Sequence, residues 1–242
     1  MTVTDRQQHR RTDRQLRQGD RAARRAAESG SGPLRDDAPP ARFPGARNRF
    51  ALLGEVLTVG ILVTLVSLPI VTLPAALVAG AGHMRRFLRA EESTFGTAWS
   101  EFRAALLGGV LVALGAAALV LVLVLDIDLA NSGALPGGPL VGLVGWVGLA
   151  GVALVLLTAS GRWSTDAGWR AALTAVPSAL RGDPAGAGYT VATAAFAVVV
   201  TWQLLPLAVP ALGCVVLALV AIPERPRRGD GDDDVLGPEE TR

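Results

Sequence analysis

Among the long stretches of this sequence without a charged residue, two have the length of a single membrane span. They cover residues 104–125 and 139–160, and each is as long as the roughly 20 apolar residues that a helix needs to cross a bilayer. Half of the 242 residues are hydrophobic and the mean hydropathy is +0.40, with the charged residues gathered at the ends and in two internal stretches. A soluble domain would interleave polar and apolar positions. The sequence therefore predicts an all-α, polytopic transmembrane helical bundle.

Two further apolar runs are interrupted by proline. Residues 50–84 are too many for one crossing and barely enough for two, and residues 184–222 pose the same problem. Proline cannot donate a helix hydrogen bond and disfavours helix at the residue before it, so each run is expected to kink or turn. The candidate structural breaks are Pro69, Pro74, Pro206 and Pro210.

The positions of the arginines indicate whether each interrupted run crosses the membrane once or twice, because cytoplasmic connections of membrane proteins are rich in basic residues. Six crossings put every arginine cluster on the cytoplasmic side, whereas four would put residues 85–103 outside. We therefore expect three helical hairpins with both termini in the cytoplasm. An alternative of four to five spans, with a re-entrant proline-broken segment, stays open. The six expected spans are residues 50–67, 68–84, 104–125, 139–160, 188–205 and 206–222.

Both ends of the chain are polar. Residues 1–49 hold twelve arginines and six acidic residues with few large apolar side chains, which predicts a disordered cytoplasmic arm that anionic lipids attract. Residues 223–242 hold seven acidic residues and four arginines, and a disordered acidic cytoplasmic tail is expected there. Because the first apolar run begins only at Phe50, we expect the spans themselves, and no cleaved signal peptide, to direct insertion.

The sequence offers few side chains for chemistry. Cys214 is the one cysteine, which excludes a disulfide framework and a CxxC metal or redox site. Glu55 is the one candidate for a functional carboxylate within a span, although it lies close enough to the helix start to reach the interface. His83 lies at the expected cytoplasmic edge and His9 lies in the arm, so no metal site or catalytic triad can be assembled. We therefore expect no cofactor, no nucleic-acid binding and no enzymatic activity.

Two aromatic segments lie among the arginines between the spans. Phe95, Trp99 and Phe102 recur at helical spacing next to Arg103. A second segment begins with Trp169 and Arg170. The spacing predicts a helix along the membrane interface in each segment. Such helices either anchor the bundle at the level of the lipid headgroups or present a docking surface to a partner.

Three motifs follow the first expected span in close succession. They are LPIVTLPA at residues 68–75, RRFLRAEE at residues 85–92 and WSEFR at residues 99–103. In these motifs the chain resembles the YesL family, small bacterial integral membrane proteins classed as a domain of unknown function. The resemblance implies a multi-pass protein of the bacterial cytoplasmic membrane that is associated with carbohydrate uptake, including ABC importers. It implies no catalytic residues.

The resemblance, the lack of catalytic groups and the two aromatic segments favour a non-catalytic accessory or regulatory membrane protein linked to carbohydrate uptake. Its expected partners are the lipid bilayer, anionic lipids at the arginine-rich arm and a sugar ABC transporter subunit. The alternative is a small-solute or lipid transporter with a site between the proline-broken helices. The sequence does not determine the oligomeric state.

Overall fold

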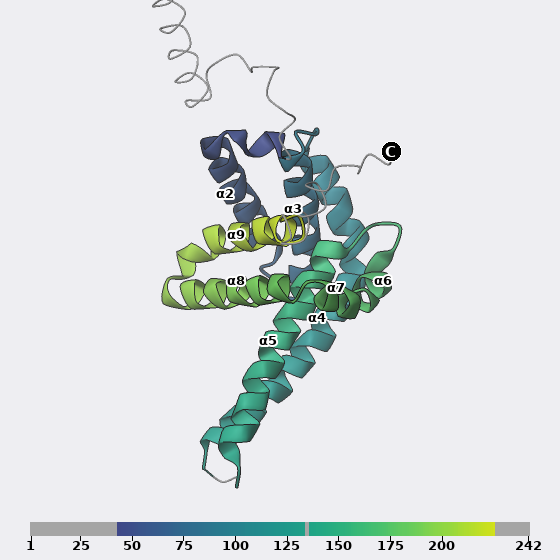
Figure 1. Ribbon diagram of the computed structural model, residues 1–242. Coiled ribbons are helices and arrows are strands. Elements are labelled where there is room, and N and C mark those ends of the chain that lie inside the picture. Colours follow the sequence, from purple (N-terminus) through teal and green to yellow (C-terminus); the bar gives the residue numbers. More distant parts are fainter. Residues whose placement is uncertain (1–42, 134–135, 226–242) are drawn as a thin grey trace, which may run out of the picture. The chain divides into compact units, whose positions relative to one another are not determined.

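The computed structural model describes residues 43–133 and 136–225. These residues are largely helical with no strand among them, which confirms the predicted all-α class (Figure 1). The described residues divide into two compact units, one of residues 43–54 with 88–90 and one of residues 55–87 with 91–133 and 136–225. The predicted arm as far as residue 42 and the predicted tail from residue 226 lie outside the described residues.

Ten helical elements follow one another along the described part of the chain. In chain order they are η1 (Pro44–Arg47), α2 (Arg49–Val66), α3 (Leu73–Leu88), α4 (Phe95–Asn131), α5 (Gly138–Arg162), α6 (Gly168–Thr174), α7 (Val176–Gly182), α8 (Pro184–Gln203), η2 (Leu205–Leu207) and α9 (Ala208–Ala221).

In the smaller unit, the side chain of Asn48 starts α2. Its Oδ1 atom accepts hydrogen bonds from the backbone N–H groups of Phe50, at 3.0 Å, and Ala51, at 3.3 Å. These are two of the amides that the first turn of a helix leaves without an intrahelical partner. The first apolar helix therefore begins within one residue of the predicted boundary at Phe50.

The first proline-broken run turns between α2 and α3. Pro69 lies within this turn, at residues 67–72, and the hydroxyl of Thr72 closes it by donating to the carbonyl oxygen of Val66 at 2.5 Å. Ile70 adopts a φ of 53°, a left-handed conformation that costs an L-residue about 1–2 kcal/mol. The reversal is thus tight enough to place strain on the backbone.

The second proline-broken run turns between α8 and α9. α8 ends at Gln203, the short η2 holds Pro206, and α9 carries Pro210 in its first turn. Pro74 lies likewise in the first turn of α3, where the missing N–H group removes no intrahelical hydrogen bond. The four candidate breaks therefore lie in a turn, in the short η2 or in the first turn of an α-helix, and none lies in the interior of an α-helix.

Four helices in the described residues are long and apolar enough to cross a membrane, namely α2, α4, α5 and α8. The helices that follow the two proline turns are shorter. α3 has 16 residues and α9 has 14, so they are about 24 Å and 21 Å long, whereas the hydrocarbon core is about 30 Å thick. Length and composition therefore support four spans, and the six predicted spans are not confirmed.

The predicted interface helix at residues 95–103 and the predicted span at residues 104–125 are one helix. α4 runs for 37 residues, or about 55 Å, because the segment has no proline and is rich in alanine and leucine. Thr94 caps its first turn by accepting a hydrogen bond from the N–H of Thr97 at 3.3 Å. The prediction of a separate helix here was therefore wrong, since no turn divides the aromatic segment from the span.

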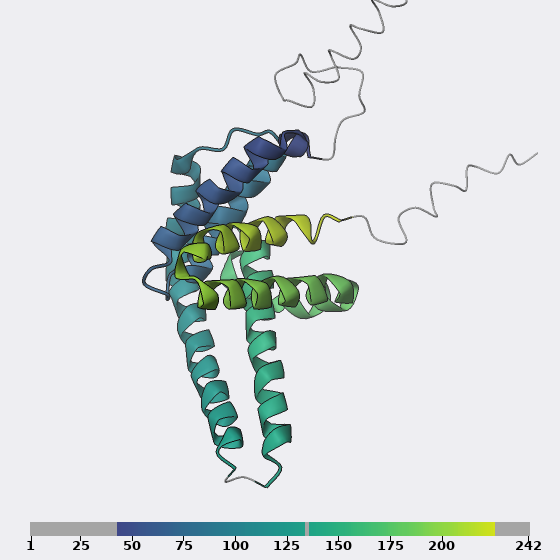
Figure 2. The same cartoon turned by 90° about the vertical axis from the view of Figure 1, so that its left-hand side faces the viewer.

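The helices α4 and α5 lie side by side as an antiparallel hairpin (Figures 1 and 2). Only 11% of the most apolar window of either helix is buried, and Leu107 and Leu111 of α4 are 84% and 72% exposed. Apolar patches of this extent on a protein surface mark contact with lipid or with another protein. The hairpin therefore indicates a membrane protein.

The buried core of the larger unit has two parts. In the first, α2 packs on α9 at Gly60 and Gly213, next to the fully buried Val59, Val63 and Val216. The second joins α3, α4, α5, α6 and α7. Its buried members are Ala75, Val78, Ala79, Phe102, Ala105, Ala159, Trp163, Trp169, Ala172 and Val176.

Candidate functional site

An acid and a histidine meet between two apolar helices. Nε2 of His83 on α3 lies 2.5 Å from Oε1 of Glu55 on α2. The side chains are 3% and 21% exposed. Because a carboxylate can only accept, the imidazole N–H is the donor when Glu55 is ionised. Ionisable side chains within apolar helices are costly unless they are paired, and they mark functional sites in membrane proteins.

The other surfaces of His83 are enclosed. Its ring stacks on the ring of Phe95 with centroids 5.7 Å apart. Its Nδ1 atom is buried and has no hydrogen-bond partner among the described residues. A buried polar atom without a partner is uncommon in folded proteins, which makes Nδ1 a candidate contact for a ligand atom.

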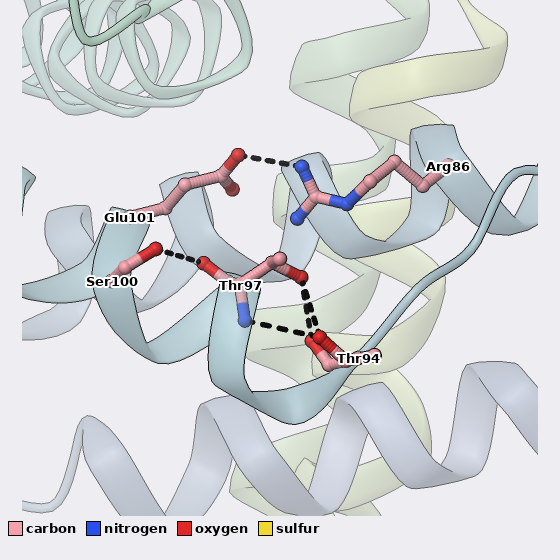
Figure 3. A network of polar contacts seen from close by, with 5 residues as sticks. All are labelled: Arg86, Thr94, Thr97, Ser100 and Glu101. Atoms are coloured by element: carbon pink, nitrogen blue, oxygen red, sulfur yellow. Dashed lines mark hydrogen bonds and ion pairs between the residues drawn. The ribbon is translucent and has the colours of Figure 1, made fainter.

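An ion pair lies on the neighbouring face of α3. Arg86 donates to Oε1 of Glu101 on α4 at 2.7 Å (Figure 3). Gly82 makes room for this carboxylate, because a Cβ at Gly82 would come within 1.9 Å of Oε2 of Glu101. Figure 3 also shows Thr97 donating to the Thr94 carbonyl at 2.7 Å at the start of α4. Glycine at position 82 therefore lets α3 and α4 approach with a charge pair between them.

The end of α3 joins three helices through three polar side chains. His83 pairs with α2 and Arg86 pairs with α4, while Arg85 donates a hydrogen bond to the carbonyl oxygen of Gly161 near the end of α5. Sequence reasoning treated this segment only as a basic cytoplasmic edge. A signal was nevertheless present, because Glu55 precedes Pro69 by 14 residues and His83 follows it by 14. A hairpin that turns near Pro69 brings those two positions side by side.

The first predicted aromatic segment is divided between surface and core. Phe95 and Trp99 are 60% and 53% exposed, whereas Phe102 is 7% exposed and stacks on Trp99 with ring centroids 5.2 Å apart. Behind these rings lies an apolar groove of about 270 Å³ between α2, α3 and α4. Its lining consists of Leu62, Val63, Val66, Ala76, Ala79, Phe95, Ala98, Trp99 and Phe102.

The second aromatic segment does not present its tryptophan to a partner. Trp169 is buried at 8% exposure, and its indole N–H donates to the carbonyl oxygen of Ala105 at 2.8 Å. The ring packs against Gly108, where a Cβ would lie 2.3 Å from it. Arg103 and Arg170 are exposed. The predicted interaction face is therefore corrected to Phe95, Trp99 and the exposed arginines, because Phe102 and Trp169 are core residues.

The described residues offer few other side chains that could bind a metal ion or react. Among the described residues, no group of three or more histidine, cysteine, aspartate or glutamate side chains is placed to hold a metal ion. Cys214 is an exposed free thiol on α9. The ionisable side chains between α2, α3 and α4 meet in pairs that are joined by hydrogen bonds.

The comparison with known protein families bears on the segment that holds His83 and the pair of Arg86 and Glu101, and this segment begins after Glu55. Residues 57–127 match the model of a family described as a protein of unknown function, DUF624. The match covers less than a third of the chain. It includes His83, Arg86 and Glu101 with the exposed Phe95 and Trp99, and it ends within α4. No curated protein and no solved structure matches the chain.

Proposed function

We propose that this chain is a YesL-like multi-pass protein of the bacterial cytoplasmic membrane. In this proposal it is a non-catalytic accessory or regulatory component of carbohydrate uptake that binds a membrane-embedded subunit of a sugar ABC importer. The observation that carries the proposal is the exposed aromatic pair of Phe95 and Trp99 at the mouth of an apolar groove. Large aromatic side chains beside an apolar pocket are typical of interaction hot spots.

The position of the aromatic pair supports a membrane partner. Phe95 and Trp99 form the first turns of α4, directly before the uncharged part of that helix, and Arg103 follows them. Tryptophan and arginine are enriched where helices leave the hydrocarbon core. This supports a partner that docks an apolar helix into the groove at the membrane interface.

The proposed topology has six spans in three hairpins with both termini cytoplasmic. The turns at Pro69 and Pro206 and the distribution of arginines support it, and α3 and α9 become spans by tilting less than the longer helices and by locally thinning the bilayer. Single cysteines at residues 70 and 205, in a chain whose Cys214 is replaced by serine, test it. Labelling of both by an impermeant thiol reagent from outside supports six spans, and labelling from the cytoplasmic side overturns them.

A photo-crosslinking amino acid at Trp99 tests the docking proposal in the native membrane. The matched control carries the same amino acid at Leu114, which is 52% exposed on the lipid-facing part of α4. Adducts with an importer membrane subunit at position 99, absent at position 114, support the proposal. Identical adducts at both positions, or lipid adducts alone at position 99, overturn the aromatic pair as a docking site.

A second function is favoured by the pair of Glu55 and His83, of which His83 is buried and Glu55 is 21% exposed. Ionisable side chains inside membrane helices mark proton relays, and proton-coupled transport of a small solute or lipid uses such relays. In this structure Gly60 and Gly213 bring α2 and α9 into backbone contact, so a path between the proline-broken helices would need these helices to separate. Flux into proteoliposomes that depends on a proton gradient and is lost in Glu55→Gln supports this function. Absence of flux across sugars, ions and lipids counts against it.

A further inference from the structure

A cavity of about 250 Å³ lies on the side of the larger unit formed by α5, α7, α8 and α9. It shares no lining residue with the aromatic groove and none with the Glu55–His83 and Arg86–Glu101 pairs, and it meets the end of α3 at Gly161, whose carbonyl oxygen accepts from Arg85. Its apolar wall consists of Leu157, Leu180, Leu219 and Ile222. Its polar wall consists of Thr158, Arg162, Ser178, Asp183 and Thr190.

The negative charge in this cavity is already neutralised. Oδ1 of Asp183 accepts hydrogen bonds from the guanidinium of Arg225 and from the backbone N–H of Gly186, the latter at 2.8 Å. Arg225 is held in place, since it also donates to the carbonyl of Ile222 at 2.9 Å and lies 5.3 Å from the centroid of the Tyr189 ring. The hydroxyl of Thr190 also has a partner in the carbonyl oxygen of Gly186.

No residue in the described part of the chain neutralises the positive charge of Arg162. This guanidinium lines the cavity, is exposed, and has no hydrogen bond or ion pair with any described residue. Arginine presents five N–H donors in a planar fork that matches the oxygens of a phosphate group. The cavity thus combines one uncommitted phosphate-binding side chain with an apolar wall.

The place of Arg162 along the chain fixes the level of the cavity in a membrane. It is the last residue of α5, which is one of the four helices long enough to cross the bilayer. A residue at the end of a span lies at the level of the lipid headgroups. Basic pockets between membrane helices at this level bind phospholipid headgroups.

We propose that this cavity binds the phosphate group of a membrane phospholipid. Arg162 holds the phosphate, while the lipid backbone and the first part of an acyl chain lie along Leu157 and Leu219. Inorganic phosphate can bind Arg162 but cannot contact the apolar wall, so this wall favours the lipid over free phosphate. The site is independent of the proposed docking face on α4, and either can fail without the other.

The proposal is tested with the purified full-length chain, stripped of lipid in detergent and titrated by native mass spectrometry. The probes are phosphatidylglycerol, a diacylglycerol that lacks phosphate, and inorganic phosphate at millimolar concentration. Phosphatidylglycerol is expected to bind, and diacylglycerol and inorganic phosphate are not expected to compete with it. Equal retention of diacylglycerol, or displacement of the lipid by inorganic phosphate, overturns the proposal.

Variants assign the binding to the cavity. Arg162→Gln should weaken phosphatidylglycerol binding about tenfold, the loss expected for a charge-assisted hydrogen bond. Arg181→Gln is the matched control, because Arg181 is exposed on α7 near the cavity but does not line it, and it should change binding less than twofold. Ala187→Met fills the cavity and should also weaken binding. Equal losses in Arg162→Gln and Arg181→Gln overturn the site, and this comparison holds whether or not Ala187→Met folds.

Discussion

Gly60 on α2 and Gly213 on α9 each lie against the backbone of the opposite helix. A Cβ at Gly60 would lie 2.2 Å from the carbonyl oxygen of Val209, and a Cβ at Gly213 would lie 2.2 Å from that of Val56. Neither contact is with a side chain that could move aside. Small residues that let helix backbones touch in this way are a common basis of helix association in membranes, where the hydrophobic effect gives little drive. This contact joins the first described apolar helix to the last.

Substitution at this contact should separate the two helices. Gly60→Ala and Gly213→Ala are each expected to lower the free energy of unfolding by about 1–3 kcal/mol, the usual cost of overpacking. Unfolding of the purified protein in mild detergent measures the change. Gly115→Ala on α4 is the control, since a Cβ there meets nothing within 4 Å. A Gly60→Ala variant as stable as Gly115→Ala would show that the helices do not touch at this point.

The Glu55 and His83 pair should behave as a coupled unit. Glu55→Leu leaves the buried imidazole of His83 without its partner, which should cost about 2–3 kcal/mol, and His83→Leu should cost less because the carboxylate of Glu55 is partly exposed. The double variant should lose less than the sum of the two single losses, by about 1–2 kcal/mol, because it leaves neither group unpaired. Denaturation of the four proteins in one detergent gives this double-mutant cycle. Strict additivity of the two losses would contradict the pairing.

Substitutions of Trp99 and Trp169, which the sequence analysis placed in similar aromatic segments, should have different effects on stability. Trp169→Phe removes the indole N–H that bonds to Ala105 and part of a ring packed on Gly108, so it should lower stability by about 1–2 kcal/mol. Trp99→Ala should change stability by less than about 0.5 kcal/mol, because Trp99 is half exposed, yet it should weaken partner binding. Unfolding midpoints and the crosslinking yield measure the two effects. A stability loss in Trp99→Ala as large as in Trp169→Phe would make both residues structural.

Local chemistry explains which parts of the structure the sequence predicts. Proline interrupts a helix at its own position because it lacks a backbone N–H, so the breaks near Pro69 and Pro206 could be placed from sequence. Helical spacing showed that Phe102 and Trp169 share a face with other aromatic or apolar residues, but it does not say whether another helix covers that face. The contact of Gly60 with Gly213 joins positions at opposite ends of the helical region, and no local pattern pairs them. The pairing of Glu55 with His83 is partly predictable from sequence. The two residues are equally far from Pro69, so a hairpin that turns at Pro69 predicts their contact, but the hairpin has to be inferred first.

The turn between α2 and α3 should become more stable when its strained residue is replaced. Ile70 has a φ of 53° and is 76% exposed. Its left-handed backbone therefore destabilises the fold, and burial of its side chain in the described structure does not offset this cost. Ile70→Gly should raise the free energy of unfolding by about 0.5–1 kcal/mol, after the greater entropy of an unfolded glycine is subtracted. Val71→Gly, one residue on, should lower it. Thermal unfolding in detergent distinguishes them, and a loss of stability in Ile70→Gly would show that the side chain, rather than the backbone, decides this position.

The Asp183 carboxylate should make two separable contributions to stability. It caps α8 by accepting from the N–H of Gly186, and it pairs with Arg225 at the end of α9. Asparagine caps a helix as well as aspartate but carries no charge, so Asp183→Asn should lose only the ion pair, about 0–1 kcal/mol for groups that are 16% and 24% exposed. Asp183→Ala should lose about 1 kcal/mol more, because it removes the cap as well. Unfolding of both variants at low and high salt separates the two, since salt should reduce the first loss and leave the second. Equal losses in the two variants would mean that the carboxylate acts through Arg225 alone and that α8 begins without its help.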